Sequence, residues 1–251
     1  MCSDFVDLRV LCDSSSFMSI AQNLALVRDR IAAAARRAGR QPEDIALMAV
    51  SKTFPTERIR ETFDAGLRLF GENRVQEFAG KTDALRDLHG AEWHLIGHLQ
   101  TNKAAKATEL FAAIDSVDSL RLAQKLNAAA QQLGKKLTVL IEINVGGEEA
   151  KSGVAPESRE LEELLAAAPK LDHLEFCGLM TVPPFTENPQ KARPYFRKLR
   201  DLRDQIAARR LLAVGMNTLS MGMSHDFEVA IEEGSTCVRV GTAIFGNRTK
   251  P

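Results

Sequence analysis

Apolar residues along the chain fall into short runs that are separated by stretches with helical spacing. A first helix is predicted by four apolar residues that recur every three or four positions: Ile20, Leu24, Val27 and Ile31. Ser19 and Gln22 have the spacing of a capping box at its start, and Gly39 and Pro42 mark its end. This helix precedes the first predicted strand.

Eight short apolar runs predict β-strands: Ile45–Val50, Leu67–Phe70, Trp93–Ile96, Ala112–Val117, Leu137–Val145, Leu174–Met180, Met216–Ser220 and Cys237–Val240. Helical patterns lie between them, at about 56–65, 73–88, 101–108, 119–133, 157–168, 187–209 and 226–233. This alternation favours parallel βαβ units and the α/β fold class, as a closed (β/α)8 TIM barrel. An open doubly wound sheet is the alternative, because the third and fourth units are short.

The length of 251 residues and the hydrophobic content of 45% suit one barrel domain, which we place at residues 18–251. Residues 1–17 show no clear period, so we expect an N-terminal extension without fixed structure, and Met18 is an alternative start. A closed barrel buries its sheet without a partner, and we therefore expect a monomer.

The composition argues against several partners and sites. With 33 basic and 33 acidic residues the formal net charge is zero, so we expect no nucleic-acid binding. No apolar run reaches the roughly 20 residues of a membrane span, and we expect no membrane association. The histidines lack the spacing of a metal site. The four cysteines lack C-x-x-C spacing, which indicates a reducing cytoplasm: Cys2, Cys12, Cys177 and Cys237.

Lys52 directly follows the first apolar run and is the leading candidate for chemistry. A lysine at the mouth of a buried strand loses hydration, which lowers the pKa of its amine and makes it a candidate for Schiff-base formation. Other polar or pocket residues also fall at or just beyond predicted strand ends: Asn73, His94, Gln100, Asn144, Met180, Ser220 and Arg239. Barrel enzymes keep their active sites at that face.

Two segments rich in small residues could hold a phosphate group. Ser220-Met-Gly222-Met-Ser224 follows the seventh strand, and Gly241 and Thr242 follow the eighth. Barrels frequently bind phosphate with this pair of loops. The alternative is an ordinary strand-to-helix turn.

Three further residues allow two interpretations each. Arg239 points away from its neighbouring valines, either toward a bound ring or into an ion pair inside the barrel with Glu142. His94 could contact a ring or transfer protons, although a lone histidine in a strand is more often a core residue with its hydrogen bonds satisfied. Lys151 is more simply a solvated charge than a second amine.

Six ordered motifs resemble the pyridoxal phosphate homeostasis protein family from about Met18 to Asn247: Val50-Ser-Lys52; Phe70-Gly-Glu-Asn73 with Gln76-Glu77; Trp93-His-Leu-Ile-Gly97 with Leu99-Gln100 and Lys103; Gly178-Leu-Met180; Leu219-Ser-Met-Gly-Met-Ser224; and Val238-Arg-Val-Gly-Thr-Ala-Ile-Phe-Gly246. The resemblance implies an alanine racemase-like barrel of fold-type III that binds pyridoxal 5′-phosphate. Lys52 matches the lysine that forms the internal aldimine. Gly146 departs from the family pattern, where serine is expected.

The resemblance also assigns the remaining cofactor contacts. Ser220, Gly222, Ser224, Gly241 and Thr242 match the phosphate cradle. Arg239 matches the position near the pyridine nitrogen, and Asn73 and Met180 match pocket positions.

Our first hypothesis is a noncatalytic carrier or buffer of pyridoxal 5′-phosphate, with cofactor-dependent apo-enzymes as candidate recipients. An arginine at the pyridine nitrogen keeps that nitrogen unprotonated and weakens the cofactor as an electron sink. The alternatives are an amino-acid racemase, for which we find no evident second base, and a Schiff-base aldolase without cofactor.

Overall fold

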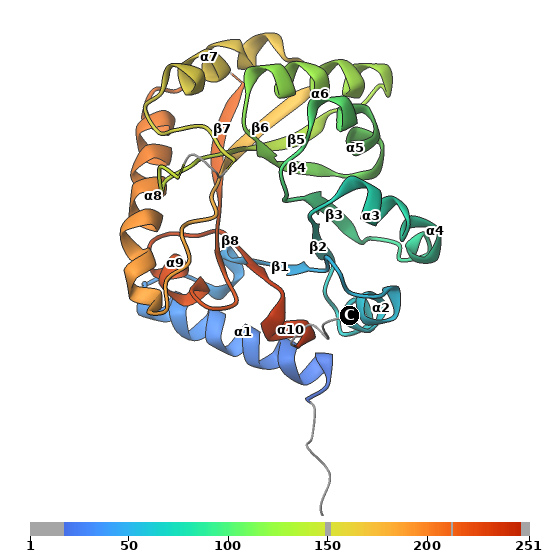
Figure 1. Ribbon diagram of the computed structural model, residues 1–251. Helices are drawn as coiled ribbons and strands as arrows, with labels where there is room; N and C mark the ends of the chain where they lie inside the picture. Colours follow the sequence, from blue (N-terminus) through green and yellow to red (C-terminus); the bar gives the residue numbers. More distant parts are fainter. Residues whose placement is uncertain (1–17, 149–151, 212, 247–251) are drawn as a thin grey trace, which may run out of the picture.

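The computed structural model describes residues 18–148, 152–211 and 213–246. Eight parallel strands form a closed barrel in chain order, and β8 pairs with β1 through registers such as Leu47 with Val238 (Figure 1). The predicted TIM barrel is thus confirmed, and the open sheet is excluded. The predicted extension at 1–17 and Lys151 lie outside the described residues.

The strands are β1 Ala46–Val50, β2 Leu69–Glu72, β3 Glu92–Leu95, β4 Ala113–Val117, β5 Leu137–Glu142, β6 Leu174–Met180, β7 Val214–Met223 and β8 Cys237–Val240. The α-helices are α1 Ile20–Arg37, α2 Thr56–Asp64, α3 Val75–Ala79, α4 Thr82–Leu85, α5 Ala104–Leu110, α6 Leu120–Gln132, α7 Arg159–Ala167, α8 Arg193–Ala208, α9 Phe227–Glu232 and α10 Thr242–Phe245. Short 3₁₀ turns are η1 Pro42–Asp44, η2 Thr101–Lys103, η3 Ala168–Lys170 and η4 Pro189–Ala192.

Helix α1 begins with the predicted capping box. The Oγ of Ser19 accepts from the backbone N–H of Gln22, and the Gln22 side chain accepts from the backbone N–H of Ser19. The apolar face of α1 is buried, and the helix runs alongside α9 and α10 (Figure 1). Asn23 ties it to α10 through a 2.9 Å hydrogen bond to the carbonyl of Ile244. The first helix therefore packs against the two helices that follow β7 and β8.

Three predicted elements differ most from the observed ones. The helix at 73–88 is divided into α3 and α4 around Gly80, because glycine is a poor helix former and Lys81 turns back to bind Glu72 and Glu77. Strand β5 ends at Glu142, because the chain turns back there. Strand β7 continues past Ser220 to Met223, which pairs with Arg239 of β8.

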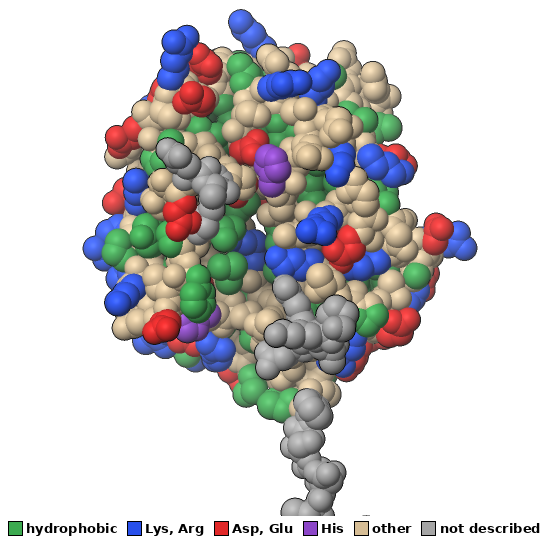
Figure 2. Space-filling view, viewed as in Figure 1, with side chains coloured by type: hydrophobic (Ala, Val, Ile, Leu, Met, Phe, Trp, Pro, Cys, Tyr) green, Lys and Arg blue, Asp and Glu red, His purple; other side chains and the backbone are tan. Residues whose placement is uncertain are grey.

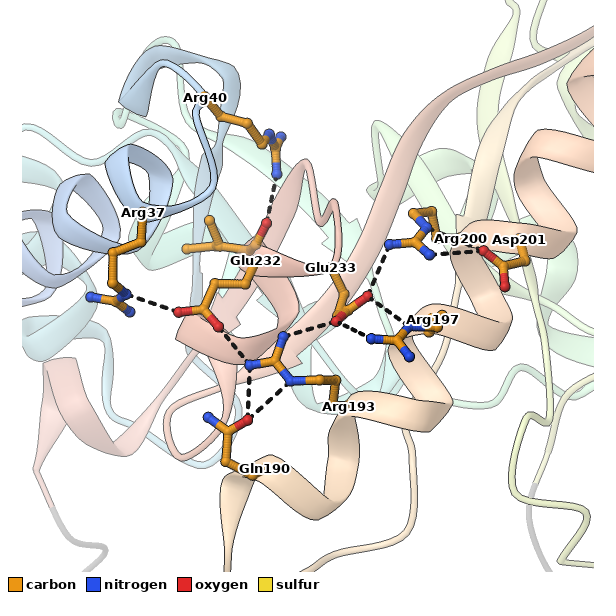
Figure 3. A network of polar contacts seen from close by, with 10 residues as sticks. Arg37, Arg40, Gln190, Arg193, Arg197, Arg200, Asp201, Glu232 and Glu233 are labelled. Atoms are coloured by element: carbon orange, nitrogen blue, oxygen red, sulfur yellow. Dashed lines mark hydrogen bonds and ion pairs between the residues drawn. The ribbon is translucent and has the colours of Figure 1, made fainter.

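A network of arginines holds α9 against α8 (Figure 3). Arg193, Arg197 and Arg200 of α8 bind the buried carboxylate of Glu233 at 2.8, 3.1 and 2.9 Å. Burial alone would raise the pKa of Glu233, but these arginines hold it below its usual value. Since Glu233 caps the end of α9, the network fixes the helix that follows Ser224. None of the helices among the described residues is long and apolar enough to cross a membrane.

Candidate functional site

A cavity of about 850 Å³ opens at the carboxyl ends of the strands. Figure 2 shows this face hollowed near its centre, with hydrophobic side chains on one side and Lys and Arg side chains on the other. Six of the nine predicted site residues line the cavity: Lys52, Asn73, Ser224, Arg239, Gly241 and Thr242. The barrel therefore brings together residues from strand ends that are far apart in the sequence.

Lys52 enters the cavity from the end of β1 and is half-buried. The residues on both sides of it are anchored. Ser51 donates a 2.8 Å hydrogen bond to Oε1 of Glu72, and the backbone N–H of Thr53 donates to Oε1 of Glu77 at 2.6 Å. Lys81 binds both carboxylates, at 3.1 and 2.9 Å. These contacts hold the backbone on each side of Lys52.

The loop after β7 and the loop after β8 meet at Ser224. Its Oγ accepts from the backbone N–H groups of Gly241 at 3.1 Å and Ala243 at 3.4 Å. Thr242 begins α10 beside them and also lines the cavity. Converging N–H groups and hydroxyls suit a phosphate group. The two segments that the sequence paired are therefore in contact.

Three predicted residues lie outside the cavity lining as the structure describes it: Met180, Ser220 and Gly222. Met180 and Ser220 are fully buried. Gly222 has φ +92°, and a Cβ there would lie 2.5 Å from Cβ of Ala230 and 2.9 Å from Cα of Phe227. The close packing of β7 against α9 therefore requires a glycine at this position.

Arg239 is buried and reaches the cavity from β8. Its Nη1 donates to Oγ of Ser220 at 2.8 Å and its Nη2 to the carbonyl of Thr181 at 2.7 Å. Burial lowers the pKa of Arg239, but a guanidinium stays charged. Within the described residues no ion pair joins Arg239 to Glu142, so that predicted partner was wrong, because hydroxyl and carbonyl acceptors lie closer.

The sequence did not identify Glu142 as a cavity residue. Its side chain lines the cavity at the end of β5 and is 6% exposed. Oε1 accepts from Ser152 at 2.9 Å, whereas Oε2 has no hydrogen-bond partner in the structure described. Burial raises the pKa of this carboxyl. The available signal was an acidic residue within an apolar strand, for which the sequence pattern suggests only a role as the partner of Arg239.

His94 is not among the cavity-lining residues described. Its Nδ1 lies 3.0 Å from Asp115 and its Nε2 3.2 Å from Glu92. Burial opposes a charge on the imidazole, but the two carboxylates outweigh it and raise the pKa of His94 to about 9. His94 is therefore an ion-paired residue of the barrel interior, which favours the core interpretation.

Asn73 lines both the cavity and a neighbouring groove of about 600 Å³. Gln100 and Lys103 line the same groove. These motif residues thus lie beside the cavity.

Residues 22–249 match the family model described as alanine racemase, N-terminal domain. The chain is 50% identical to the pyridoxal phosphate homeostasis protein of Aquifex aeolicus, over 92% of this chain and 99% of that protein. It is 46% identical to the protein of the same name from Escherichia coli K12, over 91% and 97% of the two chains. The similarity thus extends over nearly the whole length of these relatives.

Solved structures show the same similarity. PipY of Synechococcus elongatus, in a structure with pyridoxal phosphate bound, is 36% identical with a TM-score of 0.77, over 91% of this chain and all of that one (100%). An alanine racemase of Clostridium difficile is 18% identical with a TM-score of 0.67, over 91% of this chain and 57% of that one. At that identity the likeness concerns the fold alone.

Proposed function

Because the chain belongs to the pyridoxal phosphate homeostasis protein family, whose barrel is the alanine racemase N-terminal domain, we propose that it binds pyridoxal 5′-phosphate and buffers or delivers it. The observation that supports this most directly is the cavity itself. A half-buried amine, Lys52, and a pair of hydroxyl- and N–H-bearing loops line the same 850 Å³ space. An aldehyde that carries a phosphate group is a ligand that uses both.

The donor set of the cavity fits this cofactor. Ser224 and Thr242 present hydroxyl groups for a phosphate, and Gly241 lines the cavity beside them. Oε2 of Glu142 is a buried polar atom without a partner among the described residues, and such an atom in a cavity indicates a polar ligand. When bound, the cofactor supplies a reactive aldehyde and an aromatic ring that can withdraw electrons.

Each of the cavity residues has a distinct role in this proposal. Lys52 would hold the aldehyde group of the cofactor through its amine, and the anchors on Ser51 and Thr53 hold its backbone in place. Ser224, whose Oγ is held by the N–H groups of Gly241 and Ala243, would present its hydroxyl to the phosphate. Arg239 places a fixed positive charge in the cavity, held by Ser220 and Thr181.

We infer that this binding is noncatalytic and serves intracellular vitamin B6 and amino-acid homeostasis. Electron withdrawal by the cofactor is strongest when an ionised acidic residue stabilises a protonated ring nitrogen. The cavity instead holds the cation of Arg239. The names of the relatives support a homeostatic role. Amino-acid racemisation is the alternative activity.

We further infer that the protein acts in the cytoplasm, with cofactor-dependent apo-enzymes as recipients. The two cysteines in the described part of the chain, Cys177 and Cys237, are both free. Unpaired cysteines are typical of a reducing compartment.

Visible absorption spectroscopy with borohydride reduction tests the proposal. The wild type should take up added pyridoxal 5′-phosphate, and reduction should fix a pyridoxyl mass on the peptide that contains Lys52. Lys52→Ala should lose this adduct, whereas Lys103→Ala, a lysine of the neighbouring groove, should keep it. Loaded wild type that racemises alanine at an enzymatic rate would overturn the noncatalytic assignment. Absence of any adduct would overturn the binding assignment.

A further inference from the structure

Glu142 stands on the wall of the cavity opposite Lys52. The barrel closes in chain order, so β1 and β5 are separated by three strands in either direction. Lys52 follows β1 and Glu142 ends β5, and both side chains line the cavity. A ligand held by Lys52 in this cavity therefore has Glu142 on the wall across from it.

The chain builds a specific support for this carboxyl group. After β5 it turns back so that the N–H of Val154 donates to the carbonyl of Glu142 at 2.8 Å. Gly153 makes this return possible, since it has φ +108° and a Cβ there would lie 2.8 Å from the backbone N of Asn144. The return brings Oγ of Ser152 to 2.9 Å from Oε1 of Glu142. One carboxyl oxygen is thus fixed, whereas Oε2 is buried without a partner in the described structure.

An unsatisfied buried carboxyl oxygen is costly, so its presence calls for an explanation. Glu142 is 6% exposed, and Oε2 has no partner in the described structure. In the unloaded protein this arrangement destabilises the fold. A ligand with a hydrogen-bond acceptor at this point would satisfy the group.

The surroundings of Glu142 favour the protonated form of its carboxyl group over the carboxylate. Burial is the main cause that raises its pKa, and Asp118 raises it further. The hydrogen bond from Ser152 and the positive charges of Arg239 and His98 act in the opposite direction without reversing the shift. A carboxyl group that keeps its proton is a hydrogen-bond donor.

We propose that Glu142 contacts the ligand directly, and that its carboxyl group, when protonated, donates a hydrogen bond to an acceptor atom of the bound pyridine ring. This inference rests on the proposed function and adds a ring-binding residue that is independent of the covalent bond to Lys52. It also makes binding pH-dependent, because ionised Glu142 cannot donate. As the pH rises through the carboxyl pKa, the ring should be held less tightly.

The test uses 4-deoxypyridoxine 5′-phosphate, which has the ring and the phosphate but no aldehyde to react with Lys52. Its affinity is measured by calorimetry from about pH 5 to pH 8, the range in which a raised carboxyl pKa would be detected. Glu142→Gln carries an N–H donor at every pH, and Glu142→Leu has none. Asp115→Asn is the matched control, because Asp115 is also buried with an unpartnered oxygen but is not among the described lining residues.

We expect the leucine variant to bind the analogue about tenfold more weakly than wild type at low pH, the usual scale for one lost buried hydrogen bond. The glutamine variant should match wild type at low pH and bind progressively more tightly than wild type as the pH rises. The unloaded leucine variant should melt at a higher temperature, since an unsatisfied carboxyl has been removed.

Other results would separate the two proposals. If both Glu142 variants follow the wild-type affinity at every pH, the role of Glu142 is overturned while the cofactor site stands. If the wild type does not bind the analogue or pyridoxal 5′-phosphate, the proposed function fails and this inference fails with it. If the leucine variant does not unfold cooperatively, the pH dependence of analogue binding by the glutamine variant alone tests the role of Glu142.

Discussion

Arg239 donates a 2.8 Å hydrogen bond to Oγ of Ser220, and both residues are buried on neighbouring strands. The serine that the sequence placed in a phosphate cradle is thus an acceptor for the arginine. Any influence of Ser220 on a bound ligand is expected to pass through the position of Arg239.

Replacing Ser220 by alanine tests this relationship. The variant leaves a buried guanidinium without one acceptor, so the free energy of unfolding should fall by about 1–3 kcal/mol. The affinities for pyridoxal and for pyridoxal 5′-phosphate should change by the same factor, because Ser220 is buried and is not among the described cavity-lining residues. Thermal melts and titrations with both ligands measure this. A loss confined to the phosphorylated ligand would place Ser220 at the phosphate instead.

Ser224→Ala should weaken the binding of the phosphorylated ligand and not that of pyridoxal. Its Oγ accepts from the N–H of Gly241 and lines the cavity. Without it we expect pyridoxal 5′-phosphate to bind about tenfold more weakly, the scale of a lost hydrogen bond to a charged group, and pyridoxal to bind nearly as before. The same titrations measure the ratio of the affinities for pyridoxal 5′-phosphate and pyridoxal. Equal losses for the two ligands would argue against a phosphate at this loop.

Gly222→Ala should destabilise the barrel strongly. The added Cβ would meet Cβ of Ala230 at 2.5 Å, and φ is +92°. Crowding and backbone strain together should cost about 3 kcal/mol. Gly134→Ala is the control, because φ there is +62° but nothing lies within 4 Å of the added Cβ. That variant should lose only about 1 kcal/mol in denaturant unfolding. Similar losses at the two positions would show that the contact with α9 is relaxed at little cost.

His94 should make stability depend on pH on the alkaline side. The folded pKa, about 9, lies above the ordinary value of 6.5, so the stabilisation is fully present below pH 6.5 and is lost as the pH rises through 9. The shift corresponds to about 3 kcal/mol. Unfolding free energies from neutral to alkaline pH should therefore fall more steeply for wild type than for His94→Gln. Parallel profiles would mean that the ion pairs to Asp115 and Glu92 do not form.

Much of this protein could be predicted from the order of residues alone. The alternation of apolar runs with helical patterns is local, because it reflects the periods of strand and helix, and it was enough to predict the eight-stranded barrel. Lys52, Ser224 and Gly241 follow strands directly, so the common direction of parallel strands was enough to place them at one mouth.

The tertiary structure alone decided which polar atoms meet. Ser220 and Ser224 lie in one short motif, yet β7 continues beyond Ser220 and turns its hydroxyl toward Arg239, while Ser224 faces the cavity. Glu142 became a cavity residue only because barrel closure sets β5 opposite β1 and because the chain returns at Gly153. Hydrogen-bond partners depend on register and on distances of a few ångströms between distant segments, whereas hydrophobic periodicity records only which face of each segment is buried.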